Sequence, residues 1–378
     1  MPVIDRDDRM TTARTLPPGL AKSLAESARH SVLTGEPDPV ALRLLRESGL
    51  LATAVPTGYG GAGGDASDVN DVVRLLAAEN PSLAIIAFQH FAVSSRIAEW
   101  GTTAQHRELL PRLADGTWLA ASAWSEPGAG AAKQRIGTTG RRAPGGDWIL
   151  DGTKSFATGA TVADLYLVLV QTAEPDPAPT GGYGASGQTF FLIEGGNPGL
   201  GADLGLDLAG MRGSATGRVV LRGCVVGDDR RLGPEGAATR IIAGVRETGA
   251  TLGAVAAGIA EGALDLLLDH CRRRGSIESP VTRHRLVELG TEVEAVRAVV
   301  DRAGARTAAD PGLATLHSKL YASEAAERVC AEVARILSSA GYLASATVNR
   351  LLADARAVAL MGPTNDLCRD LASTGLLR

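Results

Sequence analysis

Three features of the chain could take part in chemistry by their residue types and spacing. Gly58, Gly60 and Gly63 match the GxGxxG pattern of dinucleotide-phosphate loops, but without a clear strand–helix–strand unit around them they predict a turn. Arg274 ends a run of three arginines, where a guanidinium could bind phosphate or complement the dipole at a helix C-terminus. Glu247 lies in a long apolar helical segment and could act as a general base, or be solvated beside a neighbouring arginine.

Neither the histidines nor the cysteines predict a metal site. No two histidines have the spacing of a metal-binding pair on a helix, and HExxH is absent. The four cysteines lie far apart without a CxxC pair, which argues against a zinc site and favours a reduced, cytoplasmic compartment. These residues are His30, His90, His106, His270, His284 and His317, and Cys224, Cys271, Cys330 and Cys368.

The bulk composition is that of a globular protein. The 378 residues suit two or three domains, and 45% are hydrophobic while 21% are charged. The formal net charge of −4 gives no reason to expect nucleic acid or an anionic membrane as a partner. No apolar run reaches about 18 residues and no apolar segment follows the N-terminus, so we expect neither a transmembrane helix nor a signal peptide.

The expected secondary structure runs from helices to strands and back to helices. Helical spacing of apolar residues predicts helices over residues 40–51, 68–80, 83–100, 104–113, 240–271, 284–308, 313–337 and 344–360. Short runs rich in β-branched and aromatic residues predict strands over residues 148–150, 165–170, 189–193 and 218–226. Gly258, inside the helix over 240–271, predicts a point of close helix packing.

This order of elements predicts an α+β fold with three parts. We expect an N-terminal α-helical domain over residues 1–117 and a central β-barrel-like domain over residues 118–232. A C-terminal four-helix bundle is expected over residues 233–378, and the interior of such a bundle is a common place for cofactors and subunit contacts.

Six segments, in matching order and spacing, resemble the motifs of acyl-CoA dehydrogenases. They are residues 49–61, 124–130 (WSEPGAG), 152–159 (GTKSFATG), 210–214 (GMRGS), 274–284 and 354–364 (DARAVALMGPT). The resemblance covers nearly the whole chain. It implies the same three-part fold, oligomeric assembly as a homodimer or homotetramer, and FAD bound at a subunit interface.

The same resemblance assigns residues to the cofactor. Ser125 and Thr158 would lie near the flavin ring, and the threonine would hydrogen-bond its N5 or O4. Phe156 would stack on the ring in place of a family tryptophan. Arg274 and Ser276 would reach the pyrophosphate of the FAD in the neighbouring subunit, where a planar guanidinium suits phosphate oxygens. The full set is Trp124, Ser125, Phe156, Thr158, Arg274, Ser276 and Thr364.

The chain departs from the family at the residue that does the chemistry. The family reads Tyr-Glu-Gly-Thr where this chain has Met361, Gly362, Pro363 and Thr364, so Gly362 replaces the glutamate that removes the α-proton of an acyl thioester. Glycine has no side chain that can accept a proton. Some members carry their glutamate in the long helix, but that position aligns one residue from Glu247, which is about 100° around a helix.

Three hypotheses for function follow from this departure. The first is an atypical FAD-dependent oxidoreductase that acts on an acyl thioester of CoA or a carrier protein, or on a specialised metabolite. The second is a flavin-dependent monooxygenase of the same fold, in which the flavin chemistry needs no such base. The third is a non-catalytic partner subunit that forms a hetero-oligomer with an active paralogue. Residues 338–341 (SSAG), which replace a Gly-Gly-x-Gly segment near the adenine, suit the third hypothesis.

Overall fold

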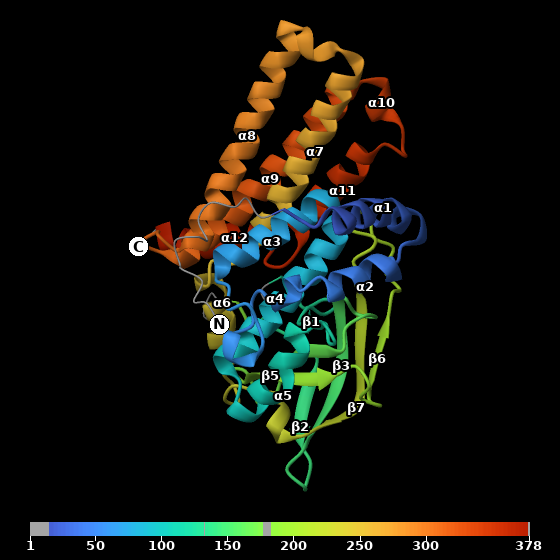
Figure 1. The fold of residues 1–378 in the computed structure, drawn as a ribbon. Coiled ribbons are helices and arrows are strands. Elements are labelled where there is room, and N and C mark those ends of the chain that lie inside the picture. The colour runs from blue at the N-terminus through green and yellow to red at the C-terminus, as the bar shows by residue number, and fades with distance from the viewer. Residues whose placement is uncertain (1–14, 132, 177–182, 377–378) are drawn as a thin grey trace, which may run out of the picture.

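The computed structural model describes residues 15–131, 133–176 and 183–376. Helices come first, strands follow and helices return, which confirms the predicted α+β order (Figure 1). The strands lie at one end of the molecule, and the long C-terminal helices extend away from them toward the other end.

The N-terminal region is helical, as the periodicity predicted. It comprises α1 (Pro18–Thr34), α2 (Pro39–Glu47), α3 (Ala66–Glu79), α4 (Pro81–Trp100) and α5 (Thr103–Ala114). The helix expected over 40–51 ends early because Gly49 adopts a left-handed conformation with φ 75°. A 3-10 turn, η3 (Thr57–Tyr59), occupies the GxGxxG segment and confirms a turn there. α1 is an additional helix that the periodicity did not predict.

The central region forms a single eight-stranded sheet within the described residues. Its strands are β1 (Ala120–Ala123), β2 (Thr139–Arg142), β3 (Trp148–Ala157), β4 (Leu165–Gln171), β5 (Gln188–Glu194), β6 (Leu200–Asp203), β7 (Gly217–Val226) and β8 (Arg231–Leu232). The hydrogen-bonded order is β6-β7-β3-β2-β4-β5-β8, and β1 pairs in parallel with β4. The first six residues of β4 and of β5 are all buried, as expected of strands covered on both faces.

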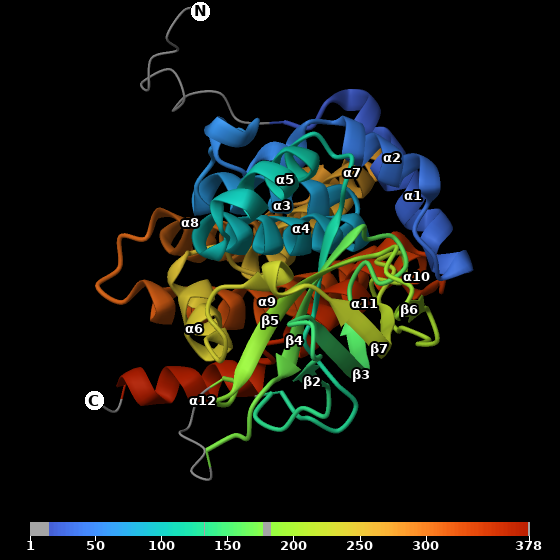
Figure 2. The same cartoon turned by 90° about the horizontal axis from the view of Figure 1, so that it is seen from below.

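The C-terminal region is helical. Its helices are α6 (Ala238–Glu247), α7 (Gly253–Arg274), α8 (Pro280–Ala305), α9 (Pro311–Leu337), α10 (Ser339–Tyr342), α11 (Thr347–Leu360) and α12 (Asn365–Leu376). Four of them, α7, α8, α9 and α11, pack side by side as the predicted bundle, and α6 lies next to β5 (Figure 2). No helix in the described ranges has the length and apolar character needed to cross a bilayer.

The prediction of a single helix over residues 240–271 is wrong. The chain forms α6 and α7, with a break that contains Gly249 at φ +86°. A Cβ atom on Gly249 would lie 2.3 Å from the carbonyl oxygen of Ala303 in α8, so the chain passes too close to α8 for any side chain. Apolar periodicity runs through this break and hides it.

Gly258 lies at a close contact between helices, as predicted. A Cβ atom there would lie 2.1 Å from the carbonyl oxygen of Arg74 in α3. The N-terminal helices are therefore packed directly against the C-terminal bundle.

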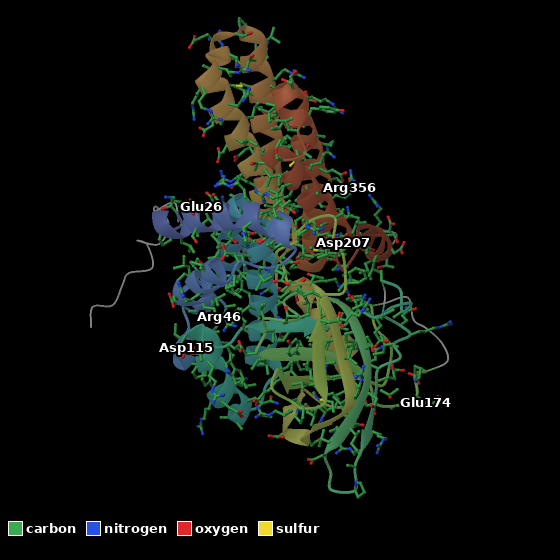
Figure 3. All side chains as sticks on the ribbon, turned by 90° about the vertical axis from the view of Figure 1, so that its right-hand side faces the viewer. Glu26, Arg46, Asp115, Glu174, Asp207 and Arg356 are labelled. Atoms are coloured by element: carbon green, nitrogen blue, oxygen red, sulfur yellow. The ribbon has the colours of Figure 1, made fainter. Side chains whose placement is uncertain are left out.

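Arg46 of α2 joins the N-terminal helices to the strands (Figure 3). Its guanidinium donates hydrogen bonds to the carbonyl oxygens of Gly116 at 3.2 Å, Thr117 at 2.9 Å and Val162 at 3.0 Å. It also pairs with Asp164 at 2.9 Å. One guanidinium thus binds carbonyl groups just before β1 and just before β4, and it holds the starts of these two parallel strands together.

Candidate functional site

The ends of β1 and β3 bring the expected flavin-contacting residues together. The backbone N–H of Ser155 donates to the carbonyl oxygen of Ser125 at 2.8 Å, so the segment after β1 lies against the end of β3. Phe156 is the next residue along, at an irregularity in the pairing of β3 with β7. Its side chain is 64% exposed, which makes it an unusually open aromatic face in a protein with few aromatics.

Backbone strain is concentrated at this place. Phe156 has φ 54°, and Met211 and Ala215 in the neighbouring loop have φ 51° and 48°. That loop is bonded to the end of β3, because the N–H groups of Gly159 and Ala160 donate to carbonyl oxygens of the loop at 3.0 and 2.8 Å. Left-handed conformations are unfavourable for residues with a side chain and cluster at functional sites. Three of them close together therefore make this place the candidate binding site.

Polar groups with spare hydrogen-bonding capacity lie on the segments next to Phe156 in the chain and in the sheet. Thr158, nearly buried, accepts a hydrogen bond from Thr216 at 3.1 Å, and Thr216 shares another with Ser214 at 2.7 Å. The indole N–H of Trp124 and the hydroxyl of Ser155 are buried and have no partner among the described residues. Buried polar atoms without partners are costly, so a planar ligand with polar edges would fit here.

A buried ion pair stabilises the turn after β1 next to this site, and it was not predicted from the sequence. Lys154 of β3 is fully buried and donates to Glu126 at 2.6 Å. Glu126 also accepts from the backbone N–H groups of Gly137 at 2.5 Å and Thr138 at 3.0 Å. Burial lowers the pKa of Lys154 to about 8, although Glu126 opposes that shift. The pair fixes the turn after β1, so the glutamate of the WSEP motif has a structural role.

Asp354 connects the bundle to the strained loop. Its carboxylate accepts from the backbone N–H of Met211 at 2.5 Å and pairs with Arg350 at 3.2 Å. Burial raises its pKa despite the nearby Arg350. The first residue of the DAR motif thus positions the loop that borders Phe156, and this role was not visible in the sequence.

The segment that carries Gly362 and Thr364 is anchored from inside the bundle. Lys319 of α9 is 3% exposed and donates to Asn365 at 2.6 Å and to the carbonyl oxygen of Ala359 at 3.2 Å. Thr364 accepts from the N–H of Leu367 at 3.3 Å and so caps the start of α12. The predicted cofactor contact of Thr364 therefore competes with a helix-capping role.

Gly362 itself is exposed, and its backbone does not require glycine. It is not among the residues with positive φ. A Cβ atom there would meet a single neighbour, the hydroxyl of Tyr183 at 3.5 Å, which is an ordinary contact distance. The structure therefore leaves room for a side chain at this position.

Glu247 is placed apart from these groups. It is exposed at the end of α6 and lies beside Gly312 at the start of α9, 3.8 Å from that glycine's would-be Cβ. No hydrogen bond or ion pair joins it to another described residue. The structure therefore describes Glu247 as a solvated carboxylate, with no feature that prepares it to act as a base.

Arg274 and Ser276 lie at the turn between α7 and α8, at the end of the bundle farthest from the strands (Figure 1). Arg274 is exposed and has no ion-pair partner among the described residues, unlike Arg272 and Arg273, which both pair with Asp269. A single subunit therefore does not bring Arg274 and Phe156 to one ligand.

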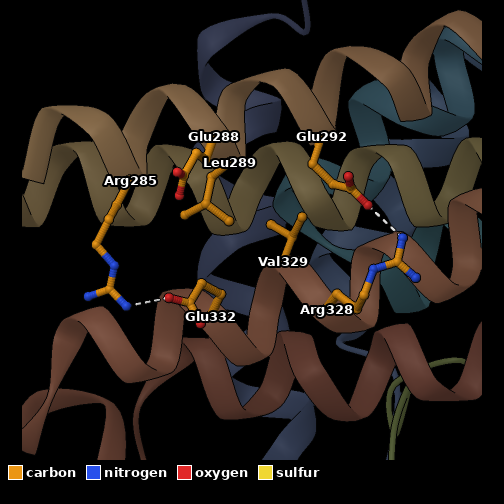
Figure 4. Close-up of a pocket in the computed structure, with 7 residues that line it drawn as sticks. All are labelled: Arg285, Glu288, Leu289, Glu292, Arg328, Val329 and Glu332. Atoms are coloured by element: carbon orange, nitrogen blue, oxygen red, sulfur yellow. Dashed lines mark hydrogen bonds and ion pairs between the residues drawn. The ribbon is translucent and has the colours of Figure 1, made fainter.

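A shallow groove between α8 and α9 is not a second candidate site. It is lined by Arg285, Glu288, Leu289, Glu292, Arg328, Val329 and Glu332 (Figure 4). Its charges satisfy one another: Arg285 pairs with Glu332 at 2.5 Å and Arg328 with Glu292 at 2.6 Å. Of the charged groups that line it, Glu288 alone has no ion pair with another described residue, and both arginines are already neutralised.

With this geometry in place, comparison with known proteins identifies the class. The chain belongs to the acyl-CoA dehydrogenase family: models of the N-terminal, middle and C-terminal domains of acyl-CoA dehydrogenase match residues 15–117, 121–224 and 239–377. It is an oxidoreductase of the acyl-CoA dehydrogenase type.

Individual relatives cover nearly the whole chain. Cyclohexane-1-carbonyl-CoA dehydrogenase of Geobacter metallireducens is 30% identical over 94% of this chain and 93% of its own length. L-prolyl-[peptidyl-carrier protein] dehydrogenase of Pseudomonas fluorescens is 29% identical over 87% of this chain and 88% of its own. The structure of butyryl-CoA dehydrogenase from Megasphaera elsdenii has a TM-score of 0.87 at 25% identity, with complete coverage of both chains.

Proposed function

We propose that the protein binds FAD and dehydrogenates an acyl thioester. The observation that carries this proposal is the open aromatic face of Phe156, held in a left-handed conformation between Ser155, whose hydroxyl has no partner among the described residues, and the Thr158–Thr216 pair. An apolar plane ringed by hydrogen-bonding groups suits an isoalloxazine ring. When bound, FAD supplies the acceptor for the two electrons that leave the acyl group.

Each residue near this face has a distinct role in the proposal. Phe156 stacks on the ring, and Ser125 and Thr158 hydrogen-bond to its polar edge. Arg274 and Ser276 act on the pyrophosphate of the FAD in a neighbouring subunit, because the α7–α8 turn that carries them lies at the end of the bundle farthest from the strands of their own subunit. The proposal therefore requires at least a homodimer.

The relatives support a thioester of a cyclic or branched acyl group. One is named for a carbocyclic CoA thioester and another for a prolyl group on a carrier protein. Both CoA and a carrier protein remain candidates for the thiol part of the substrate.

Because residue 362 is a glycine, we expect the rate of dehydrogenation to be low. A well-placed general base is worth about 10²–10⁴-fold, so dehydrogenation by this chain should be slow compared with a relative that has the carboxylate. Gly362→Glu should raise the rate of flavin reduction by a thioester by a factor in this range, because the backbone accepts a side chain there. Gly362→Gln, which has the same shape and no basic carboxylate, is the matched control and should leave the rate low.

The experiment starts from the visible absorption spectrum and mass-spectrometric extraction of the purified protein. Bound FAD, together with flavin reduction by a thioester under anaerobic conditions, is the expected result. A colourless protein that acquires FAD only when a paralogue is co-expressed would show a partner subunit instead. Oxygen consumption driven by reduced flavin, with no reduction by thioesters, would show a monooxygenase.

A further inference from the structure

Tyr183 is the side chain that faces the position of the missing carboxylate. It belongs to the connection between β4 and β5, and its position there is fixed by hydrogen bonds in the stem of that connection. The N–H of Asp176 donates to the hydroxyl of Ser186 at 2.7 Å, and the N–H of Ala185 donates to Gln188 at 3.0 Å. Gln188 in turn donates to the carbonyl oxygen of Lys133 at 2.9 Å, which ties the stem to the turn after β1.

The ring of Tyr183 is held against apolar residues, while its hydroxyl is left without a partner. The ring packs against a buried cluster that includes Ile241 and Ile242 of α6 and Phe190 of β5. Its hydroxyl lies 3.5 Å from the point where a side chain at Gly362 would begin. None of the described residues forms a hydrogen bond with that hydroxyl, so its donor and acceptor capacity is available to a ligand.

The phenol cannot replace the carboxylate as a base. Burial, with a smaller contribution from nearby Cys368, raises the pKa of Tyr183 above its ordinary value. A phenol with a raised pKa stays protonated at neutral pH, so it offers a hydrogen-bond donor where relatives with the family glutamate offer an acceptor. At this point the site therefore presents a hydrogen-bond donor in place of an acceptor.

We propose that the Tyr183 hydroxyl is a specificity-determining donor that binds an acceptor atom on the acyl group, next to the carbon that reacts. The site then selects acyl groups that carry an oxygen or an unprotonated nitrogen at that place over hydrocarbon groups of the same shape. This inference rests on the proposed function, because it takes residue 362 as the marker of the reacting carbon. An acyl group bound here would cover this hydroxyl, and a hydrocarbon would then leave the donor without a partner at the cost of its desolvation.

Two thioesters of matched ring size provide the test. Tetrahydrofuran-2-carbonyl-CoA has a ring oxygen, and cyclopentanecarbonyl-CoA has a methylene group in its place. Binding is measured by isothermal titration calorimetry on the purified protein, which does not depend on turnover. We expect wild-type protein to bind the oxygen ring about tenfold more tightly, the ratio that one net hydrogen bond provides.

Conservative variants assign the preference to one hydroxyl. Tyr183→Phe keeps the ring and removes the donor, so both thioesters should bind with nearly equal affinity. Tyr59→Phe is the control: Tyr59 packs on the same apolar cluster, but its hydroxyl lies 3.5 Å from His106 Nδ1 and does not face Gly362. It should keep the wild-type preference.

Substitutions of Gly362 test the same contact between Tyr183 and residue 362. Gly362→Glu places a carboxylate beside the phenol, which would accept its hydrogen bond and abolish the preference. Gly362→Ala adds only a methyl group at ordinary contact distance and should retain it.

The outcomes separate this inference from the proposed function. Equal binding of the two thioesters by wild-type protein, or a preference that survives in Tyr183→Phe, overturns the role of Tyr183 and leaves the dehydrogenation untouched. A preference that disappears in Tyr183→Phe without any flavin reduction by either thioester supports Tyr183 and overturns the proposed reaction. Failure to bind either CoA thioester moves the same comparison to the two acyl groups loaded on a carrier protein, and equal binding there overturns the role of Tyr183.

Discussion

At the residue scale, the conformation of Phe156 is the clearest sign of a binding role. A left-handed backbone costs an ordinary residue about 1–2 kcal/mol, and an exposed phenylalanine recovers nothing from burial within its own chain. The surroundings that hold this conformation, through β7 and the loop with Met211, keep an aromatic face open for a ligand.

Phe156→Gly and Phe156→Ala should differ in a way that isolates this strain. Both variants lose the ring, but only glycine adopts a left-handed conformation without penalty, so Phe156→Gly should be the more stable by about 1 kcal/mol. Urea unfolding of the cofactor-free proteins measures the difference. An alanine variant as stable as the glycine variant would contradict the account. Flavin affinity should fall in both, because stacking is lost in both.

The buried amine of Lys319 is expected to make the free energy of unfolding depend on pH. Burial, opposed in part by Cys368 and nearby carboxylates, lowers its pKa from 10.5 to about 8. Between these values the unfolded chain binds the proton and the folded chain does not, so rising pH favours the folded state. The free energy of unfolding of wild type relative to Lys319→Met should increase by up to about 3 kcal/mol from pH 8 to pH 10.5.

Chemical unfolding at several pH values measures this difference for Lys319→Met. Lys22→Met is the matched control, since it removes the same charge from an exposed position on α1. The Lys22 variant should follow the pH dependence of wild type. A flat difference between wild type and Lys319→Met across this range would show that the amine does not change its protonation on folding.

At the scale of elements, close approach between helices decides the architecture of the bundle. Gly258 lets α7 pass directly over the carbonyl oxygen of Arg74 in α3, and Gly249 lets the chain pass α8 where α6 ends. The close approach at Gly249 explains why the long apolar segment breaks into two helices, and the contact at Gly258 fixes how closely α7 packs on α3.

Two glycine-to-alanine substitutions in helices should have opposite effects. Gly258→Ala places a Cβ atom 2.1 Å from a backbone oxygen and must push α3 and α7 apart, at a cost of about 1–3 kcal/mol. Gly290→Ala in α8 meets nothing within 4 Å, and should stabilise the protein by about 0.5–1 kcal/mol through helix propensity. Thermal unfolding of both variants checks the pair. Destabilisation by both would point to a general intolerance of substitution.

At the scale of the whole molecule, the distance between the two halves of the proposed cofactor site requires a second subunit. The α7–α8 turn that carries Arg274 lies at the end of the bundle farthest from the strands, and Phe156 is carried by one of those strands, β3 (Figure 1). A complete site therefore combines the strands of one subunit with the α7–α8 turn of its neighbour.

Mixed assemblies test this arrangement. Phe156→Asp and Arg274→Glu should each lose FAD binding when assembled alone. Co-expressed in equal amounts, they should regain about one quarter of the wild-type flavin content, because random pairing in a symmetric oligomer joins two intact halves at that frequency. If each variant loses FAD binding and the mixture does not regain it, both residues act within one subunit.

The predictable part of this protein lies in patterns that run along the chain. The order of helices and strands, the family motifs and the glycine at position 362 are all local, because periodicity and motif spacing depend on near neighbours. The residues that sequence reasoning missed have partners far away in the chain. Glu126, after β1, pairs with Lys154 of β3, and Lys319 of α9 donates a hydrogen bond to Asn365 at the start of α12.

The sequence by itself determined the family and with it the α+β fold, and it predicted that Gly362 replaces the usual base, because each depends on residue types at fixed spacing. Only the tertiary structure decided what faces that vacant position. Tyr183 reaches Gly362 because the packing of the β4–β5 connection against α6 brings them together, and no local pattern encodes that meeting.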